Sequence, residues 1–380
     1  MLTVITGGAG FIGTALARRM LAEGHSVRIL DNFSPQIHAR RSLPDDLDGH
    51  VDLVIGDVRD RELLRETLAN ADNIVHLAAE TGTGQSMYEV ERYFSVNVGG
   101  TALLIDILQN DSPTSKLKNL VVASSRAIYG EGAYLCPEHE LVYPQPRTQK
   151  LLAQGLFEPV CPICSASCTL APTPETALCV PMSHYALTKQ VQEQAVLLYA
   201  RTANINGFAL RYQNVYGPGQ SLQNPYTGIL AVFSNLARQN AGIEIYEDGL
   251  ESRDFVFIDD VIEATALSVN FDRNYIGAIN VGTGVGVTVA YVAEQIRRFF
   301  NSESSITVTG AFRIGDIRHN IAAPDIANSI LGFRAQTNFD EGLIQFLRWA
   351  ETQEPQDKTS YERSVNELKG HGLLRQSETS

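Results

Sequence analysis

Short apolar runs alternate with amphipathic stretches along the first half of the chain. Short runs rich in β-branched residues are typical of buried strands. The pattern predicts strands over Leu2–Thr6, Ser26–Leu30, Val51–Ile55, Asn73–Leu77 and Leu120–Ser124. Between them, apolar positions at helical spacing predict helices over Phe11–Ala22, Asp60–Asn70 and Tyr88–Gln109. Because strands that alternate with helices form right-handed crossovers, the sequence predicts an α/β fold with a doubly wound parallel sheet.

This alternation is interrupted between Cys136 and Pro181, where proline, cysteine and small polar residues predominate. We interpret this segment as an insertion, after which a helix over Ser183–Thr202 and a strand over Gly207–Arg211 complete the sheet. Beyond Tyr216, mixed elements predict a smaller lobe over the carboxyl edge of the sheet. After Trp349 the chain turns polar, and we expect a solvated, partly disordered tail. The expected divisions are residues 1–132 and 182–222 for the sheet domain, 133–181 for the insertion, 223–350 for the lobe and 351–380 for the tail.

Composition restricts the class of protein. The chain has 380 residues, of which 44% are apolar and 19% charged, and a formal net charge of −13. A surface that follows nucleic-acid or anionic-lipid phosphates needs an excess of lysine and arginine, so we expect neither partner. We also expect a cytoplasmic protein, because no basic region precedes the first apolar run and no stretch is long enough to span a bilayer. The five cysteines do not have the pattern of a secreted disulfide framework.

Three glycines follow the first predicted strand, in the segment TGGAGFIG. Gly7, Gly10 and Gly13 have the spacing of the turn that opens a helix in dinucleotide-binding folds. Such a turn lets the backbone approach a pyrophosphate, and the helix N-terminus favours anions. Asp31 ends the second strand, at the spacing of the carboxylate that accepts the ribose hydroxyls. Because its charge would repel a 2′-phosphate, the sequence predicts NAD rather than NADP.

A tyrosine and a lysine lie four residues apart in the helix that follows the insertion. Tyr185 and Lys189, in SHYALTK, therefore share one helix face. A free phenol has a pKa of about 10. To act as a base near neutral pH it needs a neighbouring positive charge, which Lys189 and an oxidised nicotinamide would supply. The pair alone occurs on many helices, where it is a half-buried tyrosine beside a surface lysine.

Further segments extend the pattern: GDV at Gly56–Val58, HLAA at His76–Ala79 and SSRAIYG at Ser124–Gly130. Together with TGGAGFIG and YALTK they resemble the extended short-chain dehydrogenase/reductase family of sugar-nucleotide epimerases and dehydratases. The resemblance covers nearly the whole chain to about Trp349 and implies an NAD cofactor and a nucleotide-diphosphate sugar as substrate. It also implies that Ser125 hydrogen-bonds the sugar beside Tyr185, and that Asn97 is the buried asparagine that organises the active-site helix. The cofactor contacts that it implies are Gly7, Gly10, Phe11, Ile12, Gly13, Asp31, Asn32, Asp57, Val58, Leu77, Ala78, Ala79, Asn97, Tyr185 and Lys189.

The chain departs from the family's 4,6-dehydratases in one place. There the serine or threonine is followed by an Asp-Glu pair that eliminates water, whereas Ser125 is followed by Arg126 and Ala127. Without that acid and base, dehydration is not expected. What remains is removal of a hydride at the sugar C4, with Tyr185 as base, followed by its return to the other face, or a simple reduction or oxidation.

The second half of the chain resembles the family's sugar-nucleotide lobe in LRYQNVYGPGQ, NPYTG, SRDFVFIDD, NVGTG and RIGDIRH, in this order. By this resemblance Asn214 and Arg253 contact the diphosphate, and Arg313 or Arg318 completes the clamp. The bidentate guanidinium group suits phosphate, which explains local arginines in an acidic chain. The full set of expected substrate contacts is Ser125, Arg126, Asn214, Asn224, Arg253, Arg313 and Arg318. The resemblance also implies a homodimer through the helices around Tyr88–Gln109 and Ser183–Thr202.

Two ligand pairs occur in the insertion, Cys136-Pro137-Glu138-His139 and Cys161-Pro162-Ile163-Cys164. Two residues between the ligands of each pair match the knuckles of closed, tetrahedral zinc sites. Too few apolar residues surround them to order the segment, and metal binding would offset that cost. The sequence thus predicts a structural zinc ion on Cys136, His139, Cys161 and Cys164. The alternatives are reduced loop cysteines, or Cys168 and Cys179 as ligands in place of His139.

Three functions fit these observations. The first is a nucleotide-sugar 4-epimerase that holds NAD tightly. The second is a 4-ketoreductase or dehydrogenase that exchanges its nicotinamide at each turnover. The third is a non-catalytic dinucleotide-binding protein, and the presence of Ser125, Tyr185 and Lys189 weighs against it.

Overall fold

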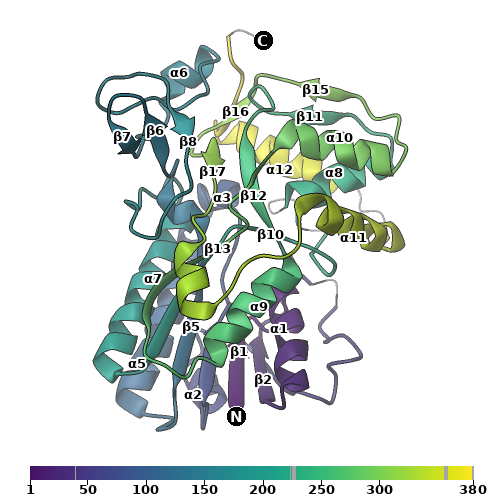
Figure 1. The fold of residues 1–380 in the computed structure, drawn as a ribbon. Helices are drawn as coiled ribbons and strands as arrows, with labels where there is room; N and C mark the ends of the chain where they lie inside the picture. The colour runs from purple at the N-terminus through teal and green to yellow at the C-terminus, as the bar shows by residue number, and fades with distance from the viewer. Residues whose placement is uncertain (39, 223, 225–227, 355–357, 379–380) are drawn as a thin grey trace.

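A seven-stranded parallel sheet forms the centre of the molecule (Figure 1). The computed structural model describes residues 1–38, 40–222, 224, 228–354 and 358–378. The strand order is β3-β2-β1-β4-β5-β9-β13, so the order reverses between β1 and β4. This confirms the predicted doubly wound α/β fold. The strands are β1 (Leu2–Thr6), β2 (Ser26–Asp31), β3 (Asp52–Ile55), β4 (Asn73–His76), β5 (Asn119–Ser125), β9 (Asn206–Tyr212) and β13 (Ile276–Val281).

Helices cover both faces of this sheet, as Figure 1 shows. Side chains of neighbouring strand residues point to opposite faces, so Val4 and Ile5 of β1 enter two different apolar clusters. One cluster packs under α1 (Phe11–Ala22) and α9 (Ile258–Val269). The other packs under α2 (Arg61–Thr67), α5 (Gly100–Asp106) and α7 (His184–Ala203). Because strand side chains are buried on both faces of the sheet, the sequences of the strands are nearly continuous apolar runs.

The helix predicted over Tyr88–Gln109 is helical but not uniform. It consists of α4 (Val90–Tyr93), η1 (Phe94–Gly99), α5 and η2 (Ile107–Asp111), and η1 and η2 are π-helical. A π-helical turn inserts an extra residue and turns the following side chains, and such turns are frequent at functional sites. Asn97 lies in η1 and is fully buried.

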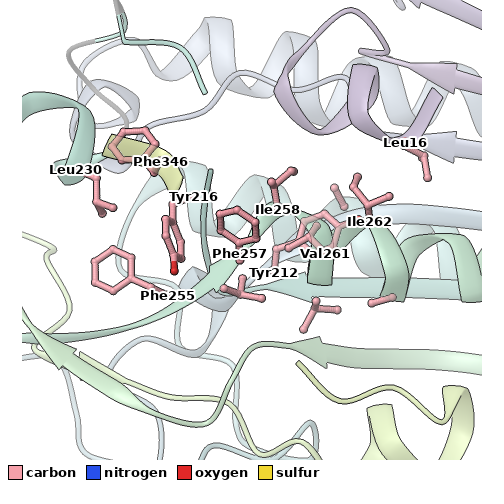
Figure 2. Packing of buried hydrophobic residues seen from close by; sticks show 14 of the residues in the cluster. Leu16, Tyr212, Tyr216, Leu230, Phe255, Phe257, Ile258, Val261, Ile262 and Phe346 are labelled. Carbon is pink, nitrogen blue, oxygen red and sulfur yellow. The ribbon is translucent and has the colours of Figure 1, made fainter. Parts of the chain in front are cut away.

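The smaller lobe lies over the carboxyl edge of the sheet (Figure 1). Its aromatic core joins the α1/α9 cluster without a break: Figure 2 shows Tyr216 between Phe255 and Phe257, and Phe257 beside Ile258 of α9. The lobe therefore shares a core with the sheet. Its strands are β10 (Asn214–Tyr216), β11 (Ile243–Ile245), β12 (Ser252–Phe257), β14 (Gly286–Thr288), β15 (Ile306–Val308) and β17 (His319–Asn320). Its helices are α8 (Ile229–Arg238), α10 (Val289–Phe299), η4 (Ala327–Leu331) and α11 (Phe339–Thr352).

The insertion begins after the short turn η3 (Arg126–Tyr129) and contains little regular structure. Its small sheet is formed by β6 (Tyr134–Cys136), β7 (Glu140–Val142) and β8 (Thr169–Leu170), in the order β7-β6-β8. One short helix, α6 (Gln149–Ala153), follows β7. Strands of two and three residues form few ladder hydrogen bonds, and a sheet of this size is marginally stable by itself.

Residues 358–378 of the tail, which we expected to be solvated and partly disordered, instead pack against the smaller lobe. The described part of the tail forms α12 (Lys358–Gly370) and β18 (Leu374–Arg375), which pairs with β16 (Phe312–Arg313). Leu368 and Leu374 are buried in one cluster with Ala311. The apolar positions Tyr361, Val365 and Leu368 lie on one face at helical spacing, and this signal outweighs the polar composition of the segment. No helix in the described part of the chain is long and apolar enough to cross a bilayer.

Candidate active site

A cavity of about 590 Å³ lies at the carboxyl ends of the parallel strands. Ligands of doubly wound folds bind at this edge, where the strand order reverses. The volume is also in the range of small-molecule sites. Residues at or directly after the ends of β1, β2, β4, β5 and β9 line it, namely Gly7, Asp31, Leu77, Ser125 and Tyr212. From there the cavity reaches Arg253 and Arg313 of the smaller lobe.

The glycine turn after β1 forms one wall of the cavity. Gly7 has a φ of 69°, and a Cβ there would lie 2.7 Å from the backbone nitrogen of Ala78. At Gly13 a Cβ would lie 2.5 Å from the Cα of Gly8. Gly10 is the N-cap of α1. Because glycine has no side chain, the first backbone N–H groups of the helix receive no hydrogen bond from a capping side chain. This wall therefore fits an anionic group such as the pyrophosphate of a dinucleotide.

Asp31 is held in a fixed orientation at the end of β2. Its two carboxylate oxygens accept hydrogen bonds from the backbone N–H groups of Ala9, at 3.0 Å, and Phe33, at 2.8 Å. Beside it, Asn32 donates a hydrogen bond to Asp57 at 3.3 Å. Predicted cofactor residues that line the cavity are Gly7, Gly10, Phe11, Ile12, Gly13, Asp31, Asn32, Asp57, Val58, Leu77, Ala78, Ala79, Tyr185 and Lys189.

Ser125, Tyr185 and Lys189 line the middle of the same cavity. Ser183 caps α7, since its hydroxyl accepts from the N–H of Ala186, and the helix then carries Tyr185 and Lys189 on one face. Burial raises the pKa of Tyr185, while a hydrogen bond with Ser125 acts in the opposite sense. Burial also lowers the pKa of Lys189 to about 7. The site thus contains a phenol and an amine whose pKa values are both shifted by removal from water.

Asn97 lies outside the cavity lining and connects two elements behind it. Its side-chain oxygen accepts from the N–H of Glu80 at 2.7 Å, and its amide donates to the hydroxyl of Thr188 at 2.9 Å. Thr188 lies between Tyr185 and Lys189 on α7. Asn97 therefore fixes α7 relative to the segment after β4, which makes it a positioning residue.

The other end of the cavity combines arginines with one central carboxylate. Arg313 pairs with Asp316 at 2.7 Å, and Arg253 lies 3.5 Å from the same carboxylate. Burial alone would raise the pKa of Asp316, but these arginines and Arg147 outweigh it and hold the pKa well below its usual range. Burial lowers the pKa of Arg126, in the same wall, to about 9, and the charge of Arg253 adds to this shift.

Several buried polar atoms of the lining have no hydrogen-bond partner among the described residues. They are one guanidinium nitrogen of Arg126, the side-chain oxygens of Gln213, Asn214 and Gln220, and one carboxylate oxygen of Glu251. Buried polar groups in native proteins are nearly always hydrogen-bonded. This set of donors and acceptors therefore fits a polar ligand with several oxygens.

Arg318 was predicted as a diphosphate contact, and this prediction was wrong. Its side chain is fully buried outside the cavity lining, where carboxylates of Glu158, Glu247 and Asp248 bind the guanidinium. An arginine with three carboxylate partners has no free face for phosphate. Asn224 is buried and also lies outside the lining, while residues 225–227 of its segment are outside the described residues.

The contribution of the tail to the site was not predicted from the sequence. Tyr361, Ser364, Val365 and Leu368 of α12 line the cavity beside Tyr246 of the lobe. Their helical spacing is present in the sequence, but nothing in it indicates where a terminal helix packs. Gln213 and Gln220 were also missed, although both lie with Asn214 in the segment LRYQNVYGPGQ.

The predicted zinc ligands come together in the insertion, outside this cavity. The ligand atoms of Cys136, His139, Cys161 and Cys164 all lie within 4.8 Å of one another. The rival cysteines, Cys168 and Cys179, do not belong to this cluster.

Comparison with known proteins gives a consistent result. The model of the NAD dependent epimerase/dehydratase family matches residues 3–150 and 163–282. A curated protein of Burkholderia thailandensis, named dTDP-L-rhamnose 4-epimerase, is 38% identical over 352 residues, which are 91% of this chain and 94% of that protein.

Solved structures of 4-epimerases have the same fold. The UDP-glucose 4-epimerase of Thermotoga maritima with UDP-glucose superposes with a TM-score of 0.73 at 25% identity, over 92% of this chain and 99% of that one. The UDP-glucose 4-epimerase of Thermus thermophilus in complex with NAD gives a TM-score of 0.71 at 25% identity, over 93% and 100%.

Proposed function

Because this chain belongs to the NAD dependent epimerase/dehydratase family, we propose that it is an NAD-dependent 4-epimerase of a nucleotide-diphosphate hexose. One observation carries the proposal. Ser125, Tyr185 and Lys189 line the same cavity as the glycine turn and Asp31, and no carboxylate follows Ser125. The cavity thus offers a base for a sugar hydroxyl next to a dinucleotide site, and the Asp-Glu pair that the family's dehydratases carry after the serine or threonine is replaced by Arg126 and Ala127.

The glycine turn and Asp31 would hold NAD, which when bound would supply the acceptor and donor of the hydride at C4 of the sugar. The phenolic oxygen of Tyr185 takes the proton of the C4 hydroxyl and gives it back to the new alcohol. Ser125 holds the same sugar oxygen by a hydrogen bond. Lys189, one helical turn from Tyr185, favours the phenolate by its charge. Asn97 keeps this face of α7 in position through Thr188.

Inversion requires that the sugar turn while its nucleotide stays bound. The end of the cavity at the smaller lobe could hold the nucleotide in place, because it is lined by Arg126, Asn214, Arg253 and Arg313. We assign these four residues to the diphosphate and the sugar. Guanidinium groups bind phosphate oxygens with two parallel hydrogen bonds, which suits an anchor.

For the substrate we propose dTDP-L-rhamnose, converted to its C4 epimer, dTDP-6-deoxy-L-talose. The support is the 38% identity, over 91% of the chain, to the protein named dTDP-L-rhamnose 4-epimerase. Selection among sugars depends on a few side chains of the cavity, so a similar fold alone does not identify the sugar.

We also propose a homodimer. Leu187 and Leu198 are exposed on α7, eleven positions apart, and therefore lie on the same face of this helix. Exposed apolar side chains in line on a helix suit a helix-packing interface. Light scattering of the purified protein should give the mass of two chains, and Leu198→Glu should shift it towards one.

The reaction is tested by incubating the purified protein with dTDP-L-rhamnose, UDP-glucose or UDP-glucuronate, without added nicotinamide, and reading the products by NMR. The proposal expects dTDP-L-rhamnose to reach equilibrium with its C4 epimer. Conversion of UDP-glucose or UDP-glucuronate instead would retain the 4-epimerase and reject the sugar. Turnover that requires stoichiometric NAD+ and yields a 4-keto sugar with NADH would identify a dehydrogenase, or a ketoreductase running in reverse, and contradict the proposal.

A further inference from the structure

Four metal-binding side chains converge in the insertion from two separate segments. Cys136 and His139 come from the β6–β7 hairpin, and Cys161 and Cys164 from a turn that is closed by a bridge between Val160 and Ser167. The Sγ atoms of Cys136 and Cys164 are 3.7 Å apart. The Nδ1 atom of His139 lies 3.6 Å from Cys136 Sγ and 3.7 Å from Cys161 Sγ.

These separations match the edges of a tetrahedron around one zinc ion. Zinc binds sulfur at about 2.3 Å and imidazole nitrogen at about 2.0–2.1 Å. In a regular tetrahedron these bond lengths place two sulfurs about 3.8 Å apart, and a sulfur and a nitrogen about 3.6 Å apart. The three distances in the protein differ from these values by about 0.1 Å.

Both ligand pairs have the same local geometry. The residue after each pair, Glu140 and Ser165, has a positive φ, at 55° and 61°. Non-glycine residues rarely adopt this conformation. This conformation turns the chain sharply directly after the second ligand of each pair. In the second turn the N–H of Ile163 also points at Cys161 Sγ, at 3.5 Å, a contact that stabilises a metal-bound thiolate.

A disulfide or apolar packing accounts for the cluster less well than a metal ion does. A disulfide requires sulfurs about 2.05 Å apart, and all five cysteines are free. Apolar packing around the four side chains is small, because their buried cluster consists of Tyr134, Val142 and the two ligands Cys136 and Cys161, while Leu152 and Phe157 of the insertion pack separately against Phe312. A cluster of this size does not offset the entropy of ordering the segment. Thiolates with an imidazole in a tetrahedron favour zinc over magnesium or calcium.

Ion pairs connect the insertion to the wall of the cavity, and those of Arg147 are buried. Arg147 donates to Glu131 and Glu247 and to the backbone oxygen of Asp316, at 2.9–3.0 Å. Glu158, three residues before Cys161, accepts from Arg318 at 2.9 Å. Asp316 in turn holds Arg313 and Arg253 in the cavity.

We propose that Cys136, His139, Cys161 and Cys164 bind one structural zinc ion. The ion orders the insertion and thereby fixes the wall of the cavity that contains Arg253, Arg313 and Asp316. All four positions of the tetrahedron are taken by protein ligands, so the ion has no open position for catalysis. The zinc site does not depend on the reaction proposed above.

Metal analysis tests the site directly. Protein produced in zinc-supplemented medium and purified without a histidine tag should contain about one zinc per chain. Cys161→Ser should lose it, whereas Cys179→Ser, in the insertion but packed against Ile128 and Tyr129 away from the four ligands, should keep it. If Cys161→Ser does not fold, cobalt(II) exchanged into the wild-type protein should give the visible absorption of tetrahedral thiolate coordination. Wild-type protein without zinc, or full zinc content in Cys161→Ser, would overturn the proposal.

Hydrogen–deuterium exchange tests the connection to the cavity. Zinc-free protein, prepared with a chelator, should exchange faster than zinc-loaded protein over residues 134–170 and 313–318. Residues 2–13, which contain β1 and the glycine turn, should exchange at the same rate in both. Unchanged exchange over 313–318 after loss of the metal would show that zinc does not support the wall, and equal loss of protection over 2–13 would indicate general unfolding instead.

Discussion

Lys189 Nζ donates a hydrogen bond to the backbone oxygen of Ala123 at 2.9 Å, so the amine of α7 is held against the carboxyl end of β5. Ser125 follows two residues later in β5, and Tyr185 precedes Lys189 by one turn. This contact brings the three proposed catalytic residues together from two elements that are far apart in the sequence.

Lys189→Met tests the charge at this position. The thioether chain fills similar space but provides no charge to favour the Tyr185 phenolate, so kcat should fall about 100-fold or more. Removal of the amine loses its hydrogen bond to Ala123 but also relieves the cost of burying a charge, which lowers the pKa of Lys189 to about 7, so the stability of the cofactor-free protein should change little. Lys150→Met, at an exposed position of α6, is the matched control. Near-normal kcat in Lys189→Met would exclude the proposed role.

Replacing Tyr185 by Phe should lower kcat about 100- to 10 000-fold, because it removes the oxygen that carries the proton. Affinity for NAD and for the sugar nucleotide should change little, since the ring remains. Tyr199→Phe changes a tyrosine of the same helix that does not line the cavity, and it should behave as wild type. Single-turnover kinetics and calorimetric binding separate the two effects, and an active Tyr185→Phe protein would require another base.

Asp31 should select NAD over NADP. In Asp31→Asn the amide oxygen can keep one of the two hydrogen bonds from Ala9 and Phe33, and the side chain no longer repels a 2′-phosphate. NAD binding should weaken, and the ratio of the two dissociation constants should move towards NADP. Asp52→Asn, at an exposed position of the edge strand β3, should leave the ratio unchanged. A wild-type protein that binds NADP more tightly than NAD would contradict the assignment.

His76 makes the fold sensitive to acid. It is buried between Thr6 and Thr101, and burial lowers its pKa from 6.5 to about 3, with a smaller effect from the charge of Lys189. Between these two pH values the unfolded chain binds a proton that the folded protein does not. The free energy of unfolding should therefore decrease as the pH falls below 6.5, by up to about 1.4 kcal/mol per pH unit.

Urea unfolding at several pH values measures this effect. His76→Gln should have a shallower dependence on pH than wild type over the acid range. His50→Gln, at an exposed position, should follow the wild-type curve. A wild-type and a His76→Gln protein with the same pH dependence would mean that His76 does not cause the acid sensitivity.

The elements around the cofactor site could be predicted because local sequence determines them. β1 and α1 have the predicted bounds, and the glycine turn between them needs conformations that side chains would block. The two turns of the insertion that carry Cys136 with His139 and Cys161 with Cys164 could be predicted for the same reason, because each pair lies in one local turn.

The errors concern tertiary packing. Arg318 and Arg313 are five residues apart and have the same chemistry, but three carboxylates from distant segments bind Arg318, while Arg313 lines the cavity. Composition likewise suggested a disordered tail, although α12 packs beside α8 and lines the cavity. Neither outcome follows from local sequence, because both depend on which surfaces meet in the folded chain.

In the proposed reaction, C4 is inverted by removal and return of the same hydrogen. The most direct measurement uses dTDP-L-rhamnose deuterated at C4, incubated with the purified protein in ordinary water without added nicotinamide, with the product examined by NMR and mass spectrometry. The proposed mechanism predicts the C4 epimer with deuterium still at C4. Hydrogen from solvent at C4 of the product, or no inversion without added coenzyme, would contradict it.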